Sequence, residues 1–297
     1  KEPVFTMNLS LAGKFSVISY ANTYKGISKK CTKLEREQLR RAIPQEIAFG
    51  VVVRTNAASL LSKLDEEQPP DILQPVTEEI NYLNQKMSFL IQEGIHRTCF
   101  SRIWKSPSGY LTAMRDEGAV YQQIITDSSN LYQELKDFAT LYMPEQVANI
   151  SMYQDNSYPL QKLYRVETQI SELLSRKVWL KSGAYLVIDK TEAMYVIDVN
   201  SGKNIAKKEM TAYIYEINIE AANEIMRQIR LRNLTGMILV DFINMDEDEK
   251  TGALLQELRT LAKEDHIQTT IVDMTALGLV EITRKKTTKS LAEQLGL

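Results

Sequence analysis

Two aspartates in the C-terminal half of the chain close two runs of apolar residues. Asp198 follows the run at 194–197, and Asp241 follows the run at 237–240. Such runs predict strands, and a strand–helix–strand connection can place both acids side by side. A carboxylate beside a buried strand is costly unless it is paired, hydrogen-bonded or bound to a metal. The pattern favours a magnesium site for phosphate chemistry, in which Asn200 could orient a metal-bound water.

Other interpretations of these acids stay open. An aspartate at a strand end is often a turn former or a helix cap, and the segment 200–202 is also a plausible turn. Asp189, Glu192 and Asp246 are competing acidic candidates, although Asp189 also fits a position beside a hairpin turn.

Two groups of basic residues could contact phosphates. Arg227 and Arg230 are three residues apart on an expected helix and share a face, which suits bidentate contacts, but pairing with Glu220 and Glu224 on a solvated face explains them equally. Near the C-terminus is a compact basic run, which fits either an RNA-backbone contact or a solvated tail. The run begins with Arg284, Lys285 and Lys286.

A third basic feature lies in the N-terminal half. Arg54 and Thr55 follow a strongly apolar run, and a guanidinium beside a hydroxyl suits a phosphate monoester. An Arg-Thr pair is also common at ordinary strand ends.

Composition narrows the chemistry further. The chain has 297 residues and a net charge of −2, which mildly disfavours a nucleic-acid protein but leaves room for local basic patches. Cys31 and Cys99 are far apart, so a cysteine zinc site within the chain is not expected. With only two histidines, catalysis must rest on carboxylates, a metal, Lys or Arg. No apolar run is long enough to span a membrane, and the N-terminus lacks both a signal-peptide core and a starting Met, as if cut.

The chain alternates expected helices and strands, which predicts an α/β fold with a mixed sheet covered by helices. In the N-terminal half we expect strands at 4–9 and 15–20 and a helix at 76–95. In the C-terminal half we expect a helix at 164–174, a hairpin around residues 190–191, a helix at 218–233 and a strand at 237–243, followed by a helix at 247–263 and strands at 267–273 and 279–283.

Several motifs resemble the ribonuclease E/G family. The matching runs lie at residues 191–194, 197–201, 218–222, 227–234, 240–243 and 277–284, and weaker similarity covers the rest of the chain. The resemblance implies an endoribonuclease that cuts single-stranded RNA and leaves 5′-phosphate and 3′-hydroxyl ends. It implies that Asp198 and Asp241 hold Mg²⁺, with Mn²⁺ as a substitute, and that Asn200 acts by hydrogen bonding. Lys203 and the basic residues above would then guide the RNA.

The resemblance also implies a sensor for a 5′-monophosphate. The sensor pair corresponds to Arg54 and Thr55, with main-chain contacts at Gly13 and Val17. A further sensor arginine of the family corresponds to Lys29, which keeps the charge but lacks the planar fork.

The implied organisation has three parts: a 5′-sensor subdomain at 1–100, part of an RNase H-like subdomain at 101–173 and a DNase I-like catalytic subdomain at 174–297. The family's S1-type OB-fold domain, the start of its RNase H-like part and its zinc-linking cysteines are not expected in this chain. Asn244 stands where the family usually has a second acidic residue after the one that corresponds to Asp241. A homo-oligomer stays open, a zinc-linked dimer is not expected, and the implied location is the cytoplasm. Two other classes remain: a non-catalytic RNA-binding or 5′-end-sensing fragment, and a metal-dependent phosphohydrolase acting on small molecules.

Overall fold

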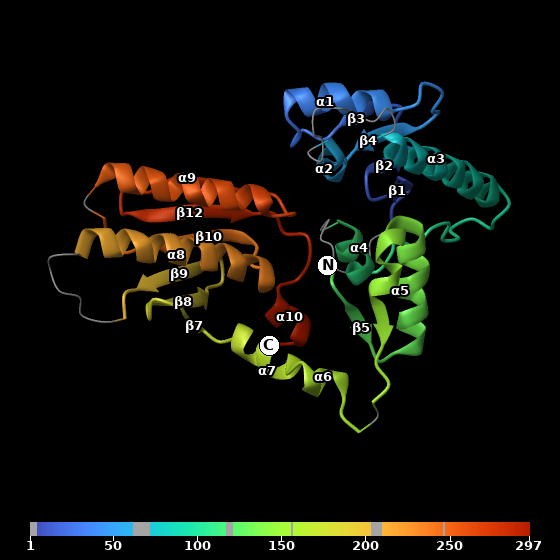
Figure 1. Cartoon of the computed structure of the whole chain (residues 1–297). Helices are drawn as coiled ribbons and strands as arrows, with labels where there is room; N and C mark the ends of the chain where they lie inside the picture. The colour runs from blue at the N-terminus through green and yellow to red at the C-terminus, as the bar shows by residue number, and fades with distance from the viewer. Residues whose placement is uncertain (1–4, 62–71, 117–120, 156, 203–209, 246) are drawn as a thin grey trace. The chain divides into compact units, whose positions relative to one another are not determined.

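The computed structural model describes residues 5–61, 72–116, 121–155, 157–202, 210–245 and 247–297. The chain divides into two compact units, Val4–Leu160 and Gln161–Leu297 (Figure 1). The described residues form a mixed α/β fold with three sheets, as the alternation of helix and strand predicts. The three-part division implied by the resemblance stays a prediction.

The first unit contains a four-stranded sheet of order β1-β2-β4-β3, in which only β3 and β4 are parallel, and a small parallel pair, β5-β6. Helix α3 begins with Pro75 in its first turn and buries one apolar stripe against the larger sheet, while α4 and α5 pack around the smaller core. Its elements are β1 (Ser10–Ala12), β2 (Ser16–Ser19), β3 (Lys25–Ile27), α1 (Lys33–Leu39), a 3₁₀ turn (Arg40–Ala42), β4 (Gly50–Val53), a 3₁₀ turn (Thr55–Ala57), α2 (Ala58–Leu61), α3 (Gln74–Ile95), α4 (Gly109–Asp116), β5 (Ile124–Thr126), α5 (Ser129–Tyr142), a 3₁₀ turn (Pro144–Asn149) and β6 (Ile150–Met152).

The second unit is built on a six-stranded sheet of order β11-β12-β10-β9-β8-β7, in which β9 and β10 are parallel and all other pairs are antiparallel. Helix α8 connects β9 to β10 as a crossover. The elements are α6 (Leu160–Leu163), α7 (Val166–Leu173), β7 (Lys177–Trp179), β8 (Tyr185–Lys190), β9 (Met194–Asn200), α8 (Met210–Leu231), β10 (Gly236–Asp241), α9 (Asp248–Glu264), β11 (Thr269–Met274), β12 (Leu279–Arg284) and α10 (Leu291–Leu295).

The structure differs from three sequence-based expectations: one strand does not form and two helices begin elsewhere. No strand forms over Phe5–Leu9, where Phe5 and Met7 are almost fully exposed and have no apolar surface to cover them. The helix expected to begin at Asn218 begins at Met210. The helix expected at 164–174 forms as α7 and begins at Val166, because Arg165 takes a left-handed backbone conformation with φ of 50°, which separates it from the short helix α6. The hairpin around residues 190–191 is confirmed.

Candidate functional site

The two faces of the six-stranded sheet differ in what covers them. Alternate residues such as Ile197, Val199, Ile238 and Val240 are buried in one core with the inward faces of α8 and α9 (Figure 1). Residues of the opposite pleat, including Asp198, are partly or fully exposed. The chemistry-bearing residues of this unit therefore lie on the second face, which we call the open face.

Asp198 and Asp241 are neighbours on this open face. The parallel ladder between β9 and β10 pairs the two residues directly, and adjacent strands lie about 4.8 Å apart. The amide Nδ2 of Asn200 donates to Oδ2 of Asp198 at 2.5 Å, as expected for residues two positions apart on one strand. Within the described part of the chain, neither carboxylate forms a salt bridge. Two unpaired like charges in register destabilise a sheet unless a cation lies between them.

The chain after Asp241 is held by α8. The side chain of Asn218, which is buried, donates to the carbonyl oxygen of Ile243 at 2.7 Å and accepts from its backbone N–H at 3.1 Å. This double hydrogen bond fixes the end of β10 against the helix. It gives Asn218, which lies in one of the motifs noted in the sequence, a positioning role.

The donor set of this acid pair fits magnesium. Mg²⁺ is commonly bound by one or two carboxylates together with waters and substrate phosphate oxygens, rather than by a closed protein cage. Among the residues that the structure describes, no cluster of three or more His, Cys, Asp or Glu could hold a metal ion. A two-carboxylate site with open positions is therefore the arrangement to consider.

The competing acids lie elsewhere. Asp189 forms a bidentate pair with Arg176 at 2.5 and 2.6 Å, which holds the pKa of that carboxyl below its usual range through hydrogen bonding. Glu192 is exposed in the hairpin turn. Asp246 lies outside the described residues. Of the candidates that the structure describes, only Asp198 and Asp241 are brought together.

The basic candidates of the second unit differ in exposure and in ion pairing. Arg227 is exposed and pairs with Glu224 at 2.9 Å, whereas Glu220 accepts backbone N–H groups of the β7–β8 turn instead of an arginine. Arg230 is partly buried, and its Nη1 has no partner among the described residues. In the C-terminal basic run, Lys285 and Lys286 are exposed. Lys203 lies outside the described residues.

Arg284, which the sequence suggested as an RNA contact, is a buried structural residue rather than an exposed cation, and its RNA contact stays an untested prediction. Its side chain is 3% exposed and pairs with Asp265 at 2.7 Å, while Nη1 donates to Asn233 and to the carbonyl of Leu234. Burial alone would raise the pKa of Asp265, but the hydrogen bonds from Arg284 and Thr269 outweigh it and lower that pKa. Arg284 ties β12 to the ends of α8 and α9.

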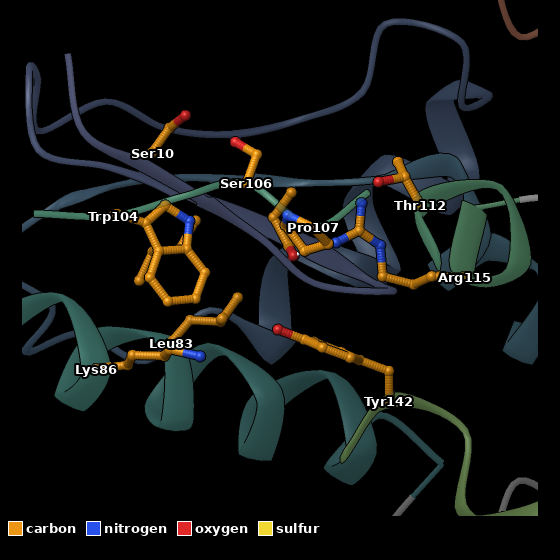
Figure 2. A pocket seen from close by; sticks show the side chains of 11 residues that line it. Ser10, Leu83, Lys86, Trp104, Ser106, Pro107, Thr112, Arg115 and Tyr142 are labelled. Carbon is orange, nitrogen blue, oxygen red and sulfur yellow. The ribbon is translucent and has the colours of Figure 1, made fainter. Parts of the chain in front are cut away.

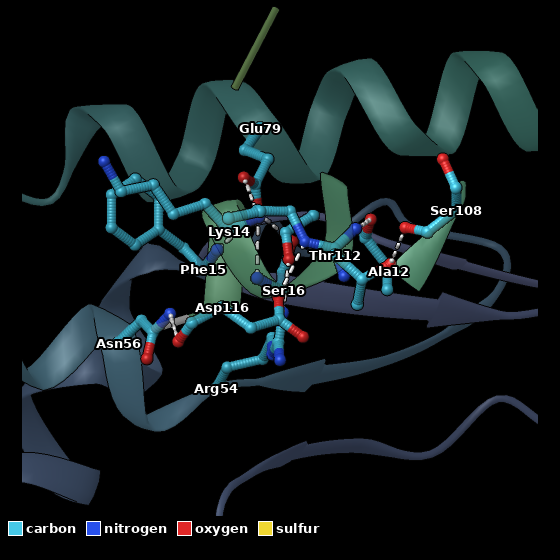
Figure 3. A network of polar contacts seen from close by, with 12 residues as sticks. Ala12, Lys14, Phe15, Ser16, Arg54, Asn56, Glu79, Ser108, Thr112 and Asp116 are labelled. Atoms are coloured by element: carbon cyan, nitrogen blue, oxygen red, sulfur yellow. Dashed lines mark hydrogen bonds and ion pairs between the residues drawn. The ribbon is translucent and has the colours of Figure 1, made fainter. Parts of the chain in front are cut away.

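The first unit brings Arg54 and Gly13 together. Nη1 of Arg54 donates to the carbonyl oxygen of Gly13 at 2.7 Å and to Oδ1 of Asp116 at 2.5 Å (Figure 3). Asp116 is also held by Arg115 at 2.7 Å, and these two hydrogen bonds outweigh its burial and lower its pKa. Nε and Nη2 of Arg54 make no hydrogen bond within the described part of the chain, so they are free for an oxyanion.

A carboxylate organises the turn between β1 and β2. Glu79 on α3 accepts the backbone N–H groups of Lys14, Phe15 and Ser16 at 2.7 to 2.9 Å, and also the hydroxyl of Ser16 (Figure 3). Burial raises the pKa of Glu79 and these hydrogen bonds oppose the rise. A Cβ at Gly13 would collide with the Glu79 carboxylate, so a larger residue there would push that carboxylate away from the turn.

The remaining sensor candidates surround this turn. Thr55 is exposed beside Arg54, and Lys29 is exposed just after Ser28, whose N–H bonds to the carbonyl of Val53. Val17 is paired with β4. Both backbone polar groups of Gly13 already have partners, since its N–H donates to Ser16 and its carbonyl accepts Arg54. Gly13 therefore has no free backbone N–H in this structure with which to make the expected contact to the phosphate.

Sequence reasoning missed Glu79, Arg115 and Asp116. Glu79 lies on an expected helix beside Glu78, and nothing in the sequence indicates that it binds the backbone of residues 14–16. Arg115 and Asp116 are an ordinary pair of adjacent charged residues in the sequence. Only the 3% exposure of the Arg115 side chain, which is unusual for arginine, would mark the pair, and burial is a property of the fold.

Arg115 also lines a cavity of about 190 Å³ (Figure 2). Trp104, Tyr142 and Lys86 line it, and the Lys86 ammonium lies 4.4 Å from the centre of the Trp104 ring. Nη1 of Arg115 donates to the carbonyl of Ala12 at 2.5 Å. The cavity wall and the Arg54 network thus share one buried guanidinium.

No helix in the described part of the chain is long and apolar enough to cross a membrane.

A family model described as "Ribonuclease E/G family" matches residues 10–287. Ribonuclease G of Salmonella typhimurium is 30% identical over 294 residues, covering 98% of this chain and 58% of the relative. Ribonuclease G of Haemophilus influenzae is 31% identical, covering 99% of this chain and 60% of the relative. Ribonuclease E of a Nostoc species is 29% identical, covering 100% of this chain and 42% of the relative.

The chain thus spans about three fifths or less of the length of these curated relatives. The match nevertheless includes both aspartates, the Arg54 turn and the helices that position them. The resemblance noted in the sequence is confirmed, and this chain belongs to the ribonuclease E/G family.

Proposed function

We propose that this chain carries a Mg²⁺-dependent endoribonuclease centre that cuts single-stranded RNA and leaves 5′-phosphate and 3′-hydroxyl ends. The observation that carries the proposal is the direct pairing of Asp198 with Asp241 on adjacent parallel strands. Membership of the ribonuclease E/G family supports the substrate class.

In this proposal Asp198 and Asp241 would hold the ion, and its remaining coordination positions would be open to water and RNA. A bound Mg²⁺ would lower the pKa of a coordinated water and polarise the scissile phosphate. Asn200 orients the Asp198 carboxylate through its hydrogen bond, and Asn218 fixes the chain that follows Asp241. No histidine or cysteine nucleophile is needed for this chemistry.

The exposed cations of the same unit supply backbone contacts. Lys285, Lys286 and Arg227 are exposed, and Lys203 belongs to the same proposal although it lies outside the described residues. Contacts of this type recognise phosphates without reading sequence, so they make binding strongly dependent on salt.

The proposal includes recognition of a 5′-monophosphate in the first unit. Arg54 offers Nε and Nη2, Thr55 offers a hydroxyl, and Lys29 adds a charge at the same edge of the sheet. Gly13 and Val17 shape the turn. A guanidinium held by a carboxylate on one side and open on the other is ready for an oxyanion without reorganising.

The test is cleavage of a labelled 5′-monophosphorylated oligoribonucleotide with and without Mg²⁺, using the parent chain and Asp198→Asn. We expect Mg²⁺-dependent cutting by the parent, 3′-hydroxyl products, and RNA binding without cutting by the variant. Equal cutting by the two proteins would refute the metal assignment. Binding without cutting by the parent would leave an RNA-binding or 5′-end-sensing module. Cutting of small phosphate esters that RNA does not inhibit would instead indicate a phosphohydrolase.

A further inference from the structure

The open face of the catalytic sheet carries an aromatic pair that the proposed chemistry does not use. Trp179 on β7 and Tyr185 on β8 are directly paired, and their ring centres lie 5.2 Å apart. Trp179 is 64% exposed. Two adjacent aromatic rings on an exposed sheet face offer a large apolar surface that a ligand ring can contact.

The pair points to the same side of the sheet as the two acids. Val178, between Lys177 and Trp179, packs on the core beneath α8 and α9, so its neighbours face the open side. Tyr185 pairs with Asn200, which places Trp179, Tyr185 and Asn200 in one row across three strands.

A second row runs parallel to the first and contains the acids. Lys177 pairs with Val187, Val187 with Asp198, and Asp198 with Asp241. Trp179 is two strands away from Asn200, which is about 10 Å at ordinary strand spacing. That separation is a short step along an extended RNA strand.

Lys177 adds a positive charge to the aromatic pair. Its Nζ lies 3.5 Å from the centre of the Tyr185 ring and 3.9 Å from that of Trp179. It forms no salt bridge within the described part of the chain, so its charge is available to a phosphate. Aromatic faces beside an unpaired cation are the combination that proteins use to hold unpaired nucleotides.

The backbone holds these residues in place. Glu220 on α8 accepts the N–H groups of Lys181 and Ser182 in the turn that joins β7 to β8. The turn after Asn200 packs against the same turn, because a Cβ at Gly202 would collide with the carbonyl oxygen of Gly183. The aromatic pair is therefore fixed relative to Asn200.

We propose that Trp179, Tyr185 and Lys177 form a platform that stacks one unpaired base of the RNA and contacts its phosphate, so that the neighbouring phosphodiester lies over Asp198 and Asp241. The inference rests on the proposed endoribonuclease function and adds a positioning site to it. Stacking does not distinguish the bases, so the platform selects single-stranded over paired RNA rather than a sequence.

The first experiment measures cleavage by Trp179→Ala, with Trp179→Phe as the conservative variant and Tyr164→Ala, an exposed aromatic of the same unit, as the matched control. We expect Trp179→Ala to raise KM by about 5- to 100-fold with a smaller effect on kcat. Trp179→Phe should restore most of the loss, and Tyr164→Ala should behave as the parent. A parent-like KM for Trp179→Ala overturns the platform.

The second experiment moves a single abasic nucleotide along the oligoribonucleotide near the cut. At one position the missing base should weaken the parent to the level of Trp179→Ala and have no further effect on that variant. If every abasic substrate penalises both proteins equally, the base does not stack on Trp179.

A third measurement does not need cleavage. The chain has two tryptophans, so Trp104→Phe leaves Trp179 as the fluorescent reporter. In the Trp104→Phe, Asp198→Asn protein, single-stranded RNA should quench the Trp179 emission and a duplex of equal length should not. Should the parent fail to cut RNA, the proposed function fails, and this quenching still decides the platform: no change in emission rejects it.

Discussion

Asp198 and Asp241, which are distant in sequence, are directly paired on neighbouring parallel strands, and no salt bridge among the described residues neutralises either one. Like charges at paired positions of a sheet repel each other. The structure thus carries an energetic cost at this site that a divalent cation would remove, which makes metal binding measurable as stability.

Mg²⁺ should therefore raise the thermal stability of the protein. At a concentration about 100 times its Kd, a ligand of the folded state stabilises by about 2.7 kcal/mol, which is several degrees in Tm. Asp198→Asn relieves the repulsion and removes a ligand, so its Tm without metal should equal or exceed that of the parent and should respond little to Mg²⁺. Identical Mg²⁺ responses of the two proteins would show that the ion binds elsewhere.

Asn200→Ala should weaken the site without destroying it. The variant loses the hydrogen bond to Oδ2 of Asp198, which orients that carboxylate. Loss of such a supporting contact typically costs about 10- to 100-fold in metal affinity or activity. Cleavage measured across a Mg²⁺ titration should show a higher metal requirement that is partly recovered at high Mg²⁺. An unchanged titration curve would show that Asn200 does not support the metal site and only forms part of the turn at 200–202.

Arg54→Ala should abolish the preference for 5′-monophosphorylated over 5′-hydroxyl RNA. The free Nε and Nη2 of Arg54 are the groups that a terminal phosphate would meet. The cutting rate on 5′-hydroxyl RNA should remain close to that of the parent, and Arg41→Ala, an exposed arginine of the same unit, serves as the control. A preference that survives in Arg54→Ala would place the phosphate contact elsewhere.

Glu79→Gln should disorganise the turn between β1 and β2. An amide cannot accept all four hydrogen bonds, and leaving donors unpaired costs about 1–3 kcal/mol each. We expect lower stability in urea and a reduced preference for 5′-monophosphate. The neighbouring Glu78→Gln is the matched control, because Glu78 is exposed and accepts only Gln74 among the described residues. Equal stability of the two variants would contradict the role of Glu79.

Arg284→Ala should destabilise the second unit without acting through RNA. Breaking a buried ion pair costs about 3–5 kcal/mol, because the Asp265 carboxylate would stay buried without the guanidinium that offsets its charge. The exposed Lys285→Ala should change stability by less than about 0.5 kcal/mol. If the two substitutions weaken RNA binding equally and leave urea unfolding unchanged, Arg284 is a surface contact after all.

The same pair predicts a pH dependence. The pKa of Asp265 is lowered in the folded state, so the unfolded chain binds more protons as the pH falls below about 3.8, its ordinary value. The stabilisation is present above that pH and is lost as the pH falls through the lowered pKa. Acid unfolding followed by circular dichroism should therefore be less steep in Asp265→Asn than in the parent. Superimposable slopes would show that the pair does not titrate in this range.

Local pattern was enough to predict much of the second unit. The hairpin around residues 190–191, the strands ending at Asp198 and Asp241 and the helix between them follow from apolar periodicity and connection rules, and their motifs identified the family. The start of α8 at Met210 and the start of α7 after the left-handed Arg165 could not be found this way, because a helix boundary depends on caps and on single backbone conformations.

The sequence by itself determined which residues could do the chemistry: two carboxylates at strand ends, an amide two residues on, and an arginine beside a threonine. Only the tertiary structure decided which charges are free to act. It pairs Asp198 with Asp241, buries Arg284 against Asp265, holds Arg54 with Asp116 and leaves Trp179 exposed on the same sheet face as the acids. The reason is physical: burial and ion pairing are set by neighbours that are distant in sequence, and no local pattern contains them.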